Sequence, residues 1–243
     1  MIQFVKQTGS TNNDMKARTD IATLPNLFTL CTFCQTAGRG QQGNKWESEP
    51  DKNISFTTII RYPEISAPAL WIVSEICAIA VAQTLSDSYN INAQVKWPND
   101  IYVGDKKICG ILIENVILGE QVVCSLAGIG LNINQTIFRS DAPNPVSMKQ
   151  LTGIEYDKEE VLKLILANIK KLLTIAPAEL KKQYMLLLYR HEEVWKWRRV
   201  QNNQTFDAEI VDIDTFGRLI LKKQDGQTET FAFKQIQYIT TSE

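Results

Sequence analysis

The sequence predicts an α/β protein in two parts, because two different patterns of hydrophobic spacing follow one another along its 243 residues. Up to about residue 192, short β-branched and apolar runs typical of strands alternate with longer stretches of helical spacing. After the charged stretch Arg190–Glu193 the period changes to two, and short segments are separated by turn residues. We therefore expect an α/β domain over residues 1–192 and a small β-barrel domain over residues 193–243.

The composition is that of an ordinary globular protein and excludes several other classes. Hydrophobic residues make up 44% and charged residues 22%, and 26 Lys and Arg balance 27 Asp and Glu to a net charge of −1. This charge is far from the basic character of a dedicated nucleic-acid binder. The first residues lack the features of a secretory signal, and the most apolar stretch, 67–85, is interrupted by polar residues, which favours a buried helix. The cysteines are then expected to be reduced thiols: Cys31, Cys34, Cys77, Cys109 and Cys124.

The first half of the α/β domain contains clear signals for helix and strand. Residues 8–12 are rich in helix-capping types, so a helix is expected to begin near Ser10 or Thr11. The patterns that follow predict two strands, a long hydrophilic loop between them and a largely buried helix. These elements cover Leu27–Phe33, Ile54–Arg61, Gln35–Glu49 and Ala69–Tyr89, respectively.

The second half begins with three more strands and ends with two helices. Asp157, followed three residues later by Glu160, resembles a capping box that opens a helix, and Pro177 is expected to end that helix. A further helix is expected over Ala178–Tyr189. The strands predicted for this half and for the barrel are Gln94–Trp97, Lys107–Glu114, Val122–Asn132, Phe206–Ile213, Arg218–Lys223 and Thr228–Phe233.

The loop Gly38–Trp46 is the most unusual stretch of the sequence. Its three glycines let backbone N–H groups approach an anion closely, while Arg39 and Lys45 add full positive charges. It is not a Walker phosphate loop, because Asn44 stands where lysine is needed and no Ser or Thr follows Lys45. Taken alone, the loop is equally compatible with anion binding and with a flexible surface loop.

A polar turn follows the strand that is predicted to end at Trp97. Pro98 forbids a helix there, and the turn presents Asn99 and Asp100 as oxygen donors, so that Asp100 could hold a hydrated Mg²⁺. Lys107 begins the next strand and could contact a phosphate if it faces a pocket. A plain hairpin with solvated lysines is the alternative.

Gly128 and Gly130 lie at the end of a predicted strand, where they let a flat ligand lie against the backbone beside Asn132. They do not form a dinucleotide-binding fingerprint, because the third glycine and the following helix are missing. Cys31 and Cys34 point to opposite faces of a strand, and the only histidine lies in the charged hinge, so neither predicts a metal site or a catalytic triad. An enzyme of this sequence would act by positioning and charge stabilisation.

Several of these motifs occur in a fixed order between about residues 8 and 134, namely Ser10-Thr11-Asn12, Gln35–Gly40, Lys45-Trp46, Lys96–Asp100, Lys107–Glu114 and Gly128–Asn132. Together they resemble the motifs of the biotin protein ligases. Each one is weak alone, but their order is highly specific. The resemblance implies a mixed-sheet catalytic domain, related to class II aminoacyl-tRNA synthetases and lipoate ligases, followed by an SH3-like barrel.

The resemblance also implies a two-step reaction. The carboxylate of biotin attacks the α-phosphate of ATP, with Mg²⁺ as counter-ion, to give biotinyl-5′-AMP and pyrophosphate. The ε-amine of a lysine on the biotin carboxyl carrier domain of a biotin-dependent carboxylase then displaces AMP. No prosthetic group is expected. The alternatives are a lipoate or octanoate ligase, which polar residues such as Ser10 and Thr11 disfavour, and a non-catalytic biotin-binding module, which would not need Lys107.

By resemblance, Lys107 is the central catalytic cation, and Arg39 closes over the adenylate together with the glycine-rich loop. The residues expected to contact biotin are Ser10, Thr11, Asn12, Gln35, Gly38, Arg39, Gly40, Gln41, Trp46, Lys107, Gly110, Gly128 and Gly130. Those expected to contact ATP are Arg39, Lys45, Trp46, Lys96, Asn99, Asp100, Lys107 and Asn132, with Mg²⁺ at Asp100.

Two features distinguish this sequence from many members of the family. Gln41 and Asn44 stand where many members carry arginines, so we expect faster escape of biotinyl-AMP than in an arginine-rich relative. The first motif begins at Ser10 and leaves no room before it for a helix-turn-helix domain, so we expect no DNA binding. We also expect a cytoplasmic location, no membrane association, and either a monomer or a homodimer.

Overall fold

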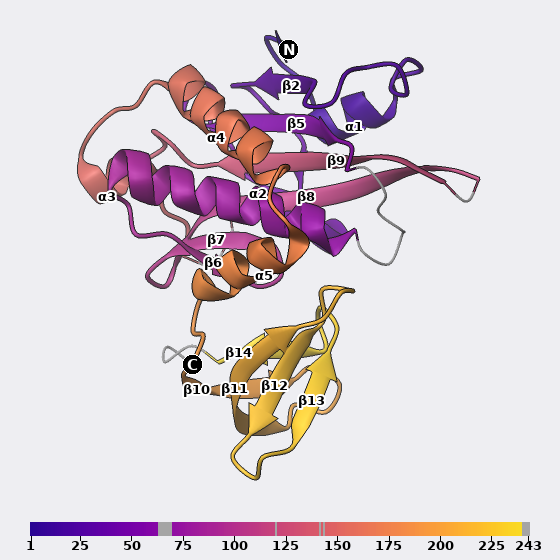
Figure 1. Ribbon diagram of the computed structural model, residues 1–243. Coiled ribbons are helices and arrows are strands. Elements are labelled where there is room, and N and C mark those ends of the chain that lie inside the picture. The colour runs from indigo at the N-terminus through magenta and orange to yellow at the C-terminus, as the bar shows by residue number, and fades with distance from the viewer. Residues whose placement is uncertain (63–69, 120, 141, 143, 240–243) are drawn as a thin grey trace.

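The computed structural model describes residues 1–62, 70–119, 121–140, 142 and 144–239. A seven-stranded sheet in the order β1-β2-β5-β9-β8-β7-β6 forms the centre of the α/β domain (Figure 1). β1 and β2 run parallel and the other neighbouring strands are antiparallel, which confirms the mixed sheet. The strands are β1 (Ile2–Phe4), β2 (Thr29–Thr32), β5 (Ile54–Ile60), β6 (Gln94–Lys96), β7 (Asp100–Val103), β8 (Lys106–Leu118) and β9 (Gln121–Leu131).

Helices cover both faces of this sheet. α2 (Trp71–Gln83) and α4 (Lys158–Leu172) pack together over one face (Figure 1). α2 is buried on almost every side, which explains why its sequence has no polar stripe. α1 (Thr11–Lys16) lies on the other face against β5 and β9. The smaller core on that face consists of Met15, Ile21, Phe28, Leu30, Ile59, Cys124 and Leu126.

Side-chain caps confirm the predicted starts of two helices. Ser10 Oγ accepts a hydrogen bond from the backbone N–H of Asn13 at 3.4 Å, at the start of α1. At the start of α4, Asp157 Oδ1 accepts from the backbone N–H groups of Glu159 and Glu160 at 2.8 and 3.3 Å. Both caps satisfy backbone donors that the first turn of a helix leaves unpaired.

The remaining helices differ in detail from the prediction. The helix expected over 69–89 is α2 followed by a π-helical turn over Thr84–Ser88, and residues 67–69 lie outside the described part of the chain. α5 (Pro177–Leu186) begins at the proline itself, because the first position of a helix needs no N–H partner. A short helix, α3 (Met148–Thr152), was not predicted.

The C-terminal domain is a five-stranded antiparallel sheet in the order β13-β12-β11-β10-β14, consistent with the SH3-like barrel that was expected. Trp197 is fully buried in its core and packs 4.3 Å from the ring of Tyr238, centroid to centroid. The strands are β10 (Val194–Arg199), β11 (Thr205–Ile213), β12 (Leu219–Lys223), β13 (Thr228–Phe231) and β14 (Ile236–Tyr238).

The C-terminal domain packs against the α/β domain beside α5 and the β6–β7 turn (Figure 1). The indole N–H of Trp97 donates to the backbone carbonyl of Gly217 at 2.8 Å. Lys181 Nζ on α5 lies 2.8 Å from Asp212 Oδ1 on β11. The first contact joins the two domains at the polar turn that follows β6, and the second joins them at α5.

The five cysteines are free thiols, as predicted. Within the described ranges, no helix combines the length and the apolar character that a membrane crossing would need.

Candidate active site

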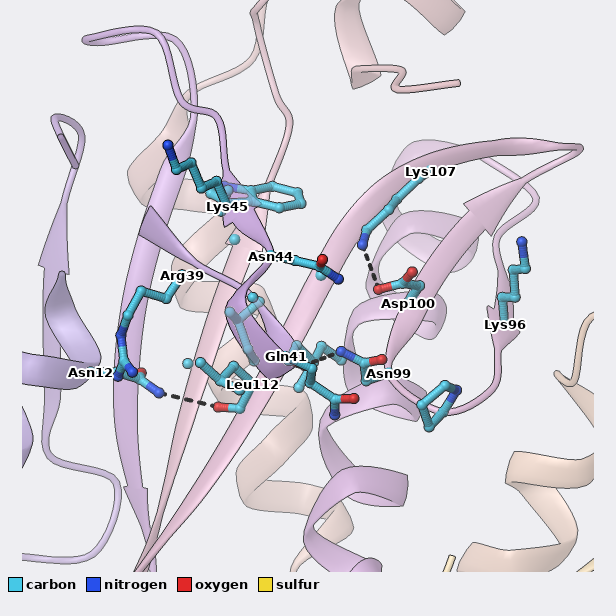
Figure 2. A pocket seen from close by; sticks show the side chains of 18 of the residues that line it. Asn12, Arg39, Gln41, Asn44, Lys45, Lys96, Asn99, Asp100, Lys107 and Leu112 are labelled. Atoms are coloured by element: carbon cyan, nitrogen blue, oxygen red, sulfur yellow. Dashed lines mark hydrogen bonds and ion pairs between the residues drawn. The ribbon is translucent and has the colours of Figure 1, made fainter. Parts of the chain in front are cut away.

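A cavity of about 420 Å³ opens between the N-terminus of α1, the glycine-rich loop, the β6–β7 turn and the C-terminal sheet (Figure 2). It brings together segments that are far apart in the sequence. Of the predicted site residues, those that line it are Ser10, Thr11, Asn12, Gln35, Arg39, Gly40, Gln41, Lys45, Trp46, Lys96, Asn99, Asp100, Lys107, Gly110, Gly128 and Gly130.

An ion pair stands at one wall of the cavity. Lys107 Nζ lies 2.6 Å from Asp100 Oδ1, and the side chains are 25% and 23% exposed (Figure 2). The pairing of β7 with β8 shifts register between Ile101 and Tyr102, so that Lys107 pairs with Tyr102 while Gly110 pairs with Asp100. Trp46 also lies near the amine, with its ring centroid 5.8 Å from Lys107 Nζ. The sequence analysis named Lys107 and Asp100 as separate site residues, and the structure places them side by side.

Asn99 connects the turn that carries Asp100 to β8. Its side-chain Nδ2 donates to the backbone carbonyl of Ile111 at 2.7 Å (Figure 2). Its backbone carbonyl accepts from the backbone N–H of Ile111 at 2.9 Å. The two bonds tie the β6–β7 turn to β8. Asn99 therefore holds Asp100 in place, in addition to lining the cavity.

Lys96 is held in an aromatic cage on the side of the C-terminal domain. Its Nζ donates to the hydroxyl of Tyr102 at 3.1 Å and lies 4.2, 5.9 and 5.2 Å from the ring centroids of Tyr102, Tyr189 and Tyr238. Burial lowers the pKa of this amine, and Asp100 partly opposes the effect. Figure 2 shows Lys96 apart from the Lys107–Asp100 pair.

The glycine-rich loop forms a small hairpin of β3 (Gly38–Arg39) and β4 (Lys45–Trp46), joined by a 3₁₀ turn over Gln41–Gly43. Arg39 Nη2 lies 2.9 Å from Glu114 Oε2, so its guanidinium is directed to the rim rather than to Lys107. Burial acts to raise the pKa of Glu114, but the hydrogen bond from Asn12 and the charge of Arg39 lower it overall. Arg39, which was expected to close over the adenylate, is thus paired with the carboxylate of Glu114.

Three glycines make room for larger side chains at the cavity floor. A Cβ on Gly130 would lie 2.5 Å from the indole of Trp46, and one on Gly110 would lie 3.1 Å from it. A Cβ on Gly128 would lie 2.1 Å from Oδ1 of Asn12. Trp46 and Asn12 therefore pack directly on the backbone of β8 and β9, and a side chain at Gly128 or Gly130 would displace them.

Hydrogen-bonding groups gather at the end of the cavity formed by α1. The backbone N–H of Thr11 donates to Gln35 Oε1 at 3.0 Å, and the hydroxyl of Ser10 caps the helix. Ser10, Thr11 and Asn12 are all more than nine-tenths buried. Buried hydroxyl and amide groups need hydrogen-bond partners, so this end of the cavity is suited to a compact polar ligand group that can supply them.

Two predicted residues do not line the cavity. Gly38 is buried in the β3–β4 hairpin, where a Cβ would lie only 2.6 Å from the carbonyl oxygen of Trp46. Asn132 is buried, and its Nδ2 donates to the carbonyl of Val146 at 3.1 Å. Residues that the sequence did not indicate also line it: Ser55 on β5, and Phe233, Ile236, Gln237 and Tyr238 of the C-terminal domain.

Residues 4–132, just over half of the chain, match the Biotin/lipoate A/B protein ligase family. The chain belongs to this family. Residues 199–243 match the Biotin protein ligase C terminal domain. The family match covers α1, the glycine-rich loop, the β6–β7 turn and Lys107, which are the parts of the α/β domain that surround the cavity.

Curated relatives of this family member include ligases from several bacteria. The Bifunctional ligase/repressor BirA of Bacillus spizizenii is 30% identical over 204 residues, which cover 79% of this chain and 60% of the relative. The Biotin--[acetyl-CoA-carboxylase] ligase of Paracoccus denitrificans is 34% identical over 137 residues, or 54% of this chain and 56% of the relative. The chain thus spans about 60% of the length of these relatives.

Solved structures confirm the fold of this family member. A biotin protein ligase from Aquifex aeolicus in complex with biotin and ATP matches with a TM-score of 0.80 at 22% identity. The match covers 98% of this chain and 99% of the other, so it includes both domains.

Proposed function

We propose that this protein is an ATP-dependent biotin protein ligase, which forms biotinyl-5′-AMP and transfers biotin to a lysine of a biotin carboxyl carrier domain. The observation that carries the proposal is the position of the Lys107–Asp100 pair. It lies at the wall of one cavity that also holds a buried polar pocket at α1 and the β6–β7 turn. One relative is named Biotin--[acetyl-CoA-carboxylase] ligase, and a solved biotin protein ligase with biotin and ATP matches both domains.

In the first step an oxygen of the biotin carboxylate attacks the α-phosphorus of ATP, and the bond from that phosphorus to pyrophosphate breaks. Both reactants are anions, so their approach requires a nearby positive charge. Lys107 supplies an ammonium on β8, and Asp100 Oδ1 lies 2.6 Å from it. We assign Lys107 to hold the carboxylate and the α-phosphate together.

In the second step the lysine amine of the carrier domain attacks the acyl carbon, and the anhydride bond to AMP breaks. The amine loses a proton, and AMP leaves as a stable anion. Water would compete for the same carbon, so the adenylate must be covered. The hairpin of β3 and β4 carries Arg39 at the rim, and we assign it to this cover once Arg39 exchanges Glu114 for the ligand.

Mg²⁺ would enter with ATP. It usually takes one or two carboxylates from the protein and completes its shell with water and phosphate oxygens. Asp100 offers one carboxylate on the cavity wall, which fits such a shared ion. In the described part of the chain, no cluster of three or more His, Cys, Asp and Glu forms a separate metal site. When bound, the ion would neutralise charge on the triphosphate.

Octanoate or lipoate transfer on the same scaffold is the main competing activity. Their acyl chains carry no urea, so the buried hydroxyls of Ser10 and Thr11 would lose hydrogen bonds to water without gaining any from the ligand. This pocket therefore favours biotin. A non-catalytic biotin-binding protein would need no cation at Lys107.

The direct test is adenylate formation. The protein is incubated with ATP, Mg²⁺ and radiolabelled biotin, and the nucleotide products are separated. A second reaction contains labelled octanoate in place of biotin. We expect biotinyl-AMP only, and later labelling of a protein band when a host lysate is added. Octanoyl-AMP as the main product would show that the substrate is wrong, and binding of biotin without any adenylate would show a non-catalytic module.

A further inference from the structure

Thr57 on β5 is fully buried and does not line the cavity, yet its hydroxyl reaches two residues that do. It pairs across the sheet with Gly128 on β9. Because Gly128 has no side chain, the amide of Asn12 fills the space beside it. The hydroxyl oxygen of Thr57 lies 2.8 Å from Thr11 Oγ1 and is hydrogen-bonded to Asn12 Oδ1.

The surroundings of Asn12 fix which way its amide faces. Its nitrogen lies 3.3 Å from the carbonyl of Leu112 and 3.0 Å from Glu114 Oε2, and both of these atoms only accept hydrogen bonds (Figure 2). The amide oxygen must therefore face Thr57. Since an amide oxygen cannot donate, the single hydroxyl proton of Thr57 goes to Asn12.

This assignment determines the hydrogen bond of Thr11. With its proton directed to Asn12, Thr57 can only accept from Thr11 at 2.8 Å, and because the other acceptor near Thr11 Oγ1, Gln35 Oε1, is farther away at 3.4 Å, the hydroxyl proton of Thr11 is directed into the sheet. The lone pairs of Thr11 Oγ1 then remain for an N–H group in the cavity. Gln35 Oε1 accepts from the backbone of Thr11, which leaves the NH₂ of Gln35 as a donor.

The hydroxyl oxygen of Ser10 already accepts a hydrogen bond from the backbone N–H of Asn13, so its proton remains to donate. The cavity therefore has a hydrogen-bond acceptor at Thr11 and donors at Gln35 and Ser10. A cyclic urea presents the matching pattern, an N–H beside a C=O. We propose that Thr57 is a positioning residue for the ureido ring of biotin, because it sets the hydrogen-bond direction of Thr11 and the orientation of Asn12. The inference rests on the proposed function.

The neighbouring residue provides a matched control. Thr58 is equally buried, but its side chain lies on the opposite face of the sheet, where its hydroxyl is 3.0 Å from that of Thr29. Valine has the shape of threonine without the hydroxyl, so Thr57→Val and Thr58→Val each remove one buried hydrogen-bonding group from the same strand. Only the first change reaches the cavity.

The experiment measures biotin affinity by calorimetry and the kinetics of adenylate formation for both variants and for Thr57→Ser. We expect Thr57→Val to raise the Kd and KM for biotin about tenfold, with kcat at saturating biotin nearly unchanged. Thr57→Ser restores the affinity. Thr58→Val keeps the wild-type Kd, although its Tm falls as much as that of Thr57→Val.

Equal biotin affinity of the two valine variants, or a serine variant as weak as Thr57→Val, would overturn the role of Thr57. The proposed function fails separately. A wild-type protein that binds biotin but forms no adenylate is not a ligase, and its binding data would still decide the role of Thr57. Wild-type protein that binds no biotin at all would refute both.

Discussion

Lys107 has two properties that its proposed role as a catalytic cation requires. Its side chain is about three-quarters buried, so its field is screened less by water than that of a surface lysine. Asp100 at 2.6 Å balances the charge while the site is empty. The lysine is therefore kept in position before either substrate arrives, and substrate anions can take over part of the role of Asp100.

Replacing Lys107 tests this role directly. We expect Lys107→Ala to lower the rate of biotinyl-AMP formation by about a hundredfold or more, because a preorganised charge at the reacting atoms is lost. The fold should persist, since the side chain lines a cavity rather than the core. Rapid-quench measurement of the adenylate and a circular dichroism melt check both points. Lys106→Ala, at the exposed neighbouring position, should retain the wild-type rate.

Gly130 and Gly110 allow a graded test of the cavity floor. Gly130→Ala places a Cβ 2.5 Å from the indole of Trp46, whereas Gly110→Ala places one at 3.1 Å. We expect the first change to displace Trp46 and to raise the KM for biotin about tenfold, and the second to have a clearly smaller effect. Steady-state kinetics with both variants provide the measurement. Equal effects would contradict the packing that the distances describe.

At the scale of elements, prediction succeeded where a segment was long or had a distinctive cap. Ser10 and Asp157 marked two helix starts, and the long strands β8 and β9 were recognised from their apolar runs. The short strands β1, β3, β4, β7, β10 and β14 were missed. Their residues have weak local preference, and pairing with distant strands decides their conformation. A loop was predicted over Gln35–Glu49 for the same reason.

The 3₁₀ turn of the β3–β4 hairpin permits a test of adenylate retention. Gln41 lines the cavity, so Gln41→Arg adds a guanidinium that can bind the phosphate of biotinyl-AMP. We expect release of the adenylate to slow by about three- to tenfold. Gln41→Glu, of opposite charge, should speed release. Filter-binding of labelled adenylate over time measures both rates, and identical rates would show that the turn does not contact the phosphate.

At the scale of the whole molecule, a buried glutamate, Glu75, lies near the Lys181–Asp212 contact between the two domains. Glu75 on α2 is 6% exposed, and burial raises its pKa to about 7, although the charge of Lys181 partly opposes this. Its unfolded-state pKa is near 4.5, so the folded protein binds this proton more tightly. The resulting stabilisation is complete below pH 4.5 and is lost as the pH rises to about 7.

Glu75→Gln removes this pH dependence. We expect the variant to exceed the wild type in free energy of unfolding by about 2–3 kcal/mol at pH 8 and to match it near pH 4.5. Urea denaturation at the two pH values gives the comparison. Glu193→Gln, at an exposed position, serves as the control and should follow the wild type throughout. A constant difference between Glu75→Gln and wild type would rule out the titration of Glu75.

The sequence identified the cavity-lining residues of the α/β domain but not those of the C-terminal domain. Ordered motifs identified nearly all of the residues that line the cavity from α1, the glycine-rich loop, β8 and β9. Phe233 and Tyr238 carried no such signal, because their place at the cavity depends on how two separately patterned domains pack. The buried contact of Asn132 with Val146 could not be predicted for a similar reason, since Val146 lies on an irregular segment.

The contact of Trp97 with Gly217 has a consequence for mutational screens. The indole adjoins the turn that carries Asp100, and its hydrogen-bond partner belongs to a hairpin of the other domain. Random mutagenesis scored by growth should therefore return loss-of-function alleles in the last fifty or so codons, far in the sequence from the motifs of the α/β domain. Such alleles would report a distorted β6–β7 turn in a protein that still accumulates to normal levels.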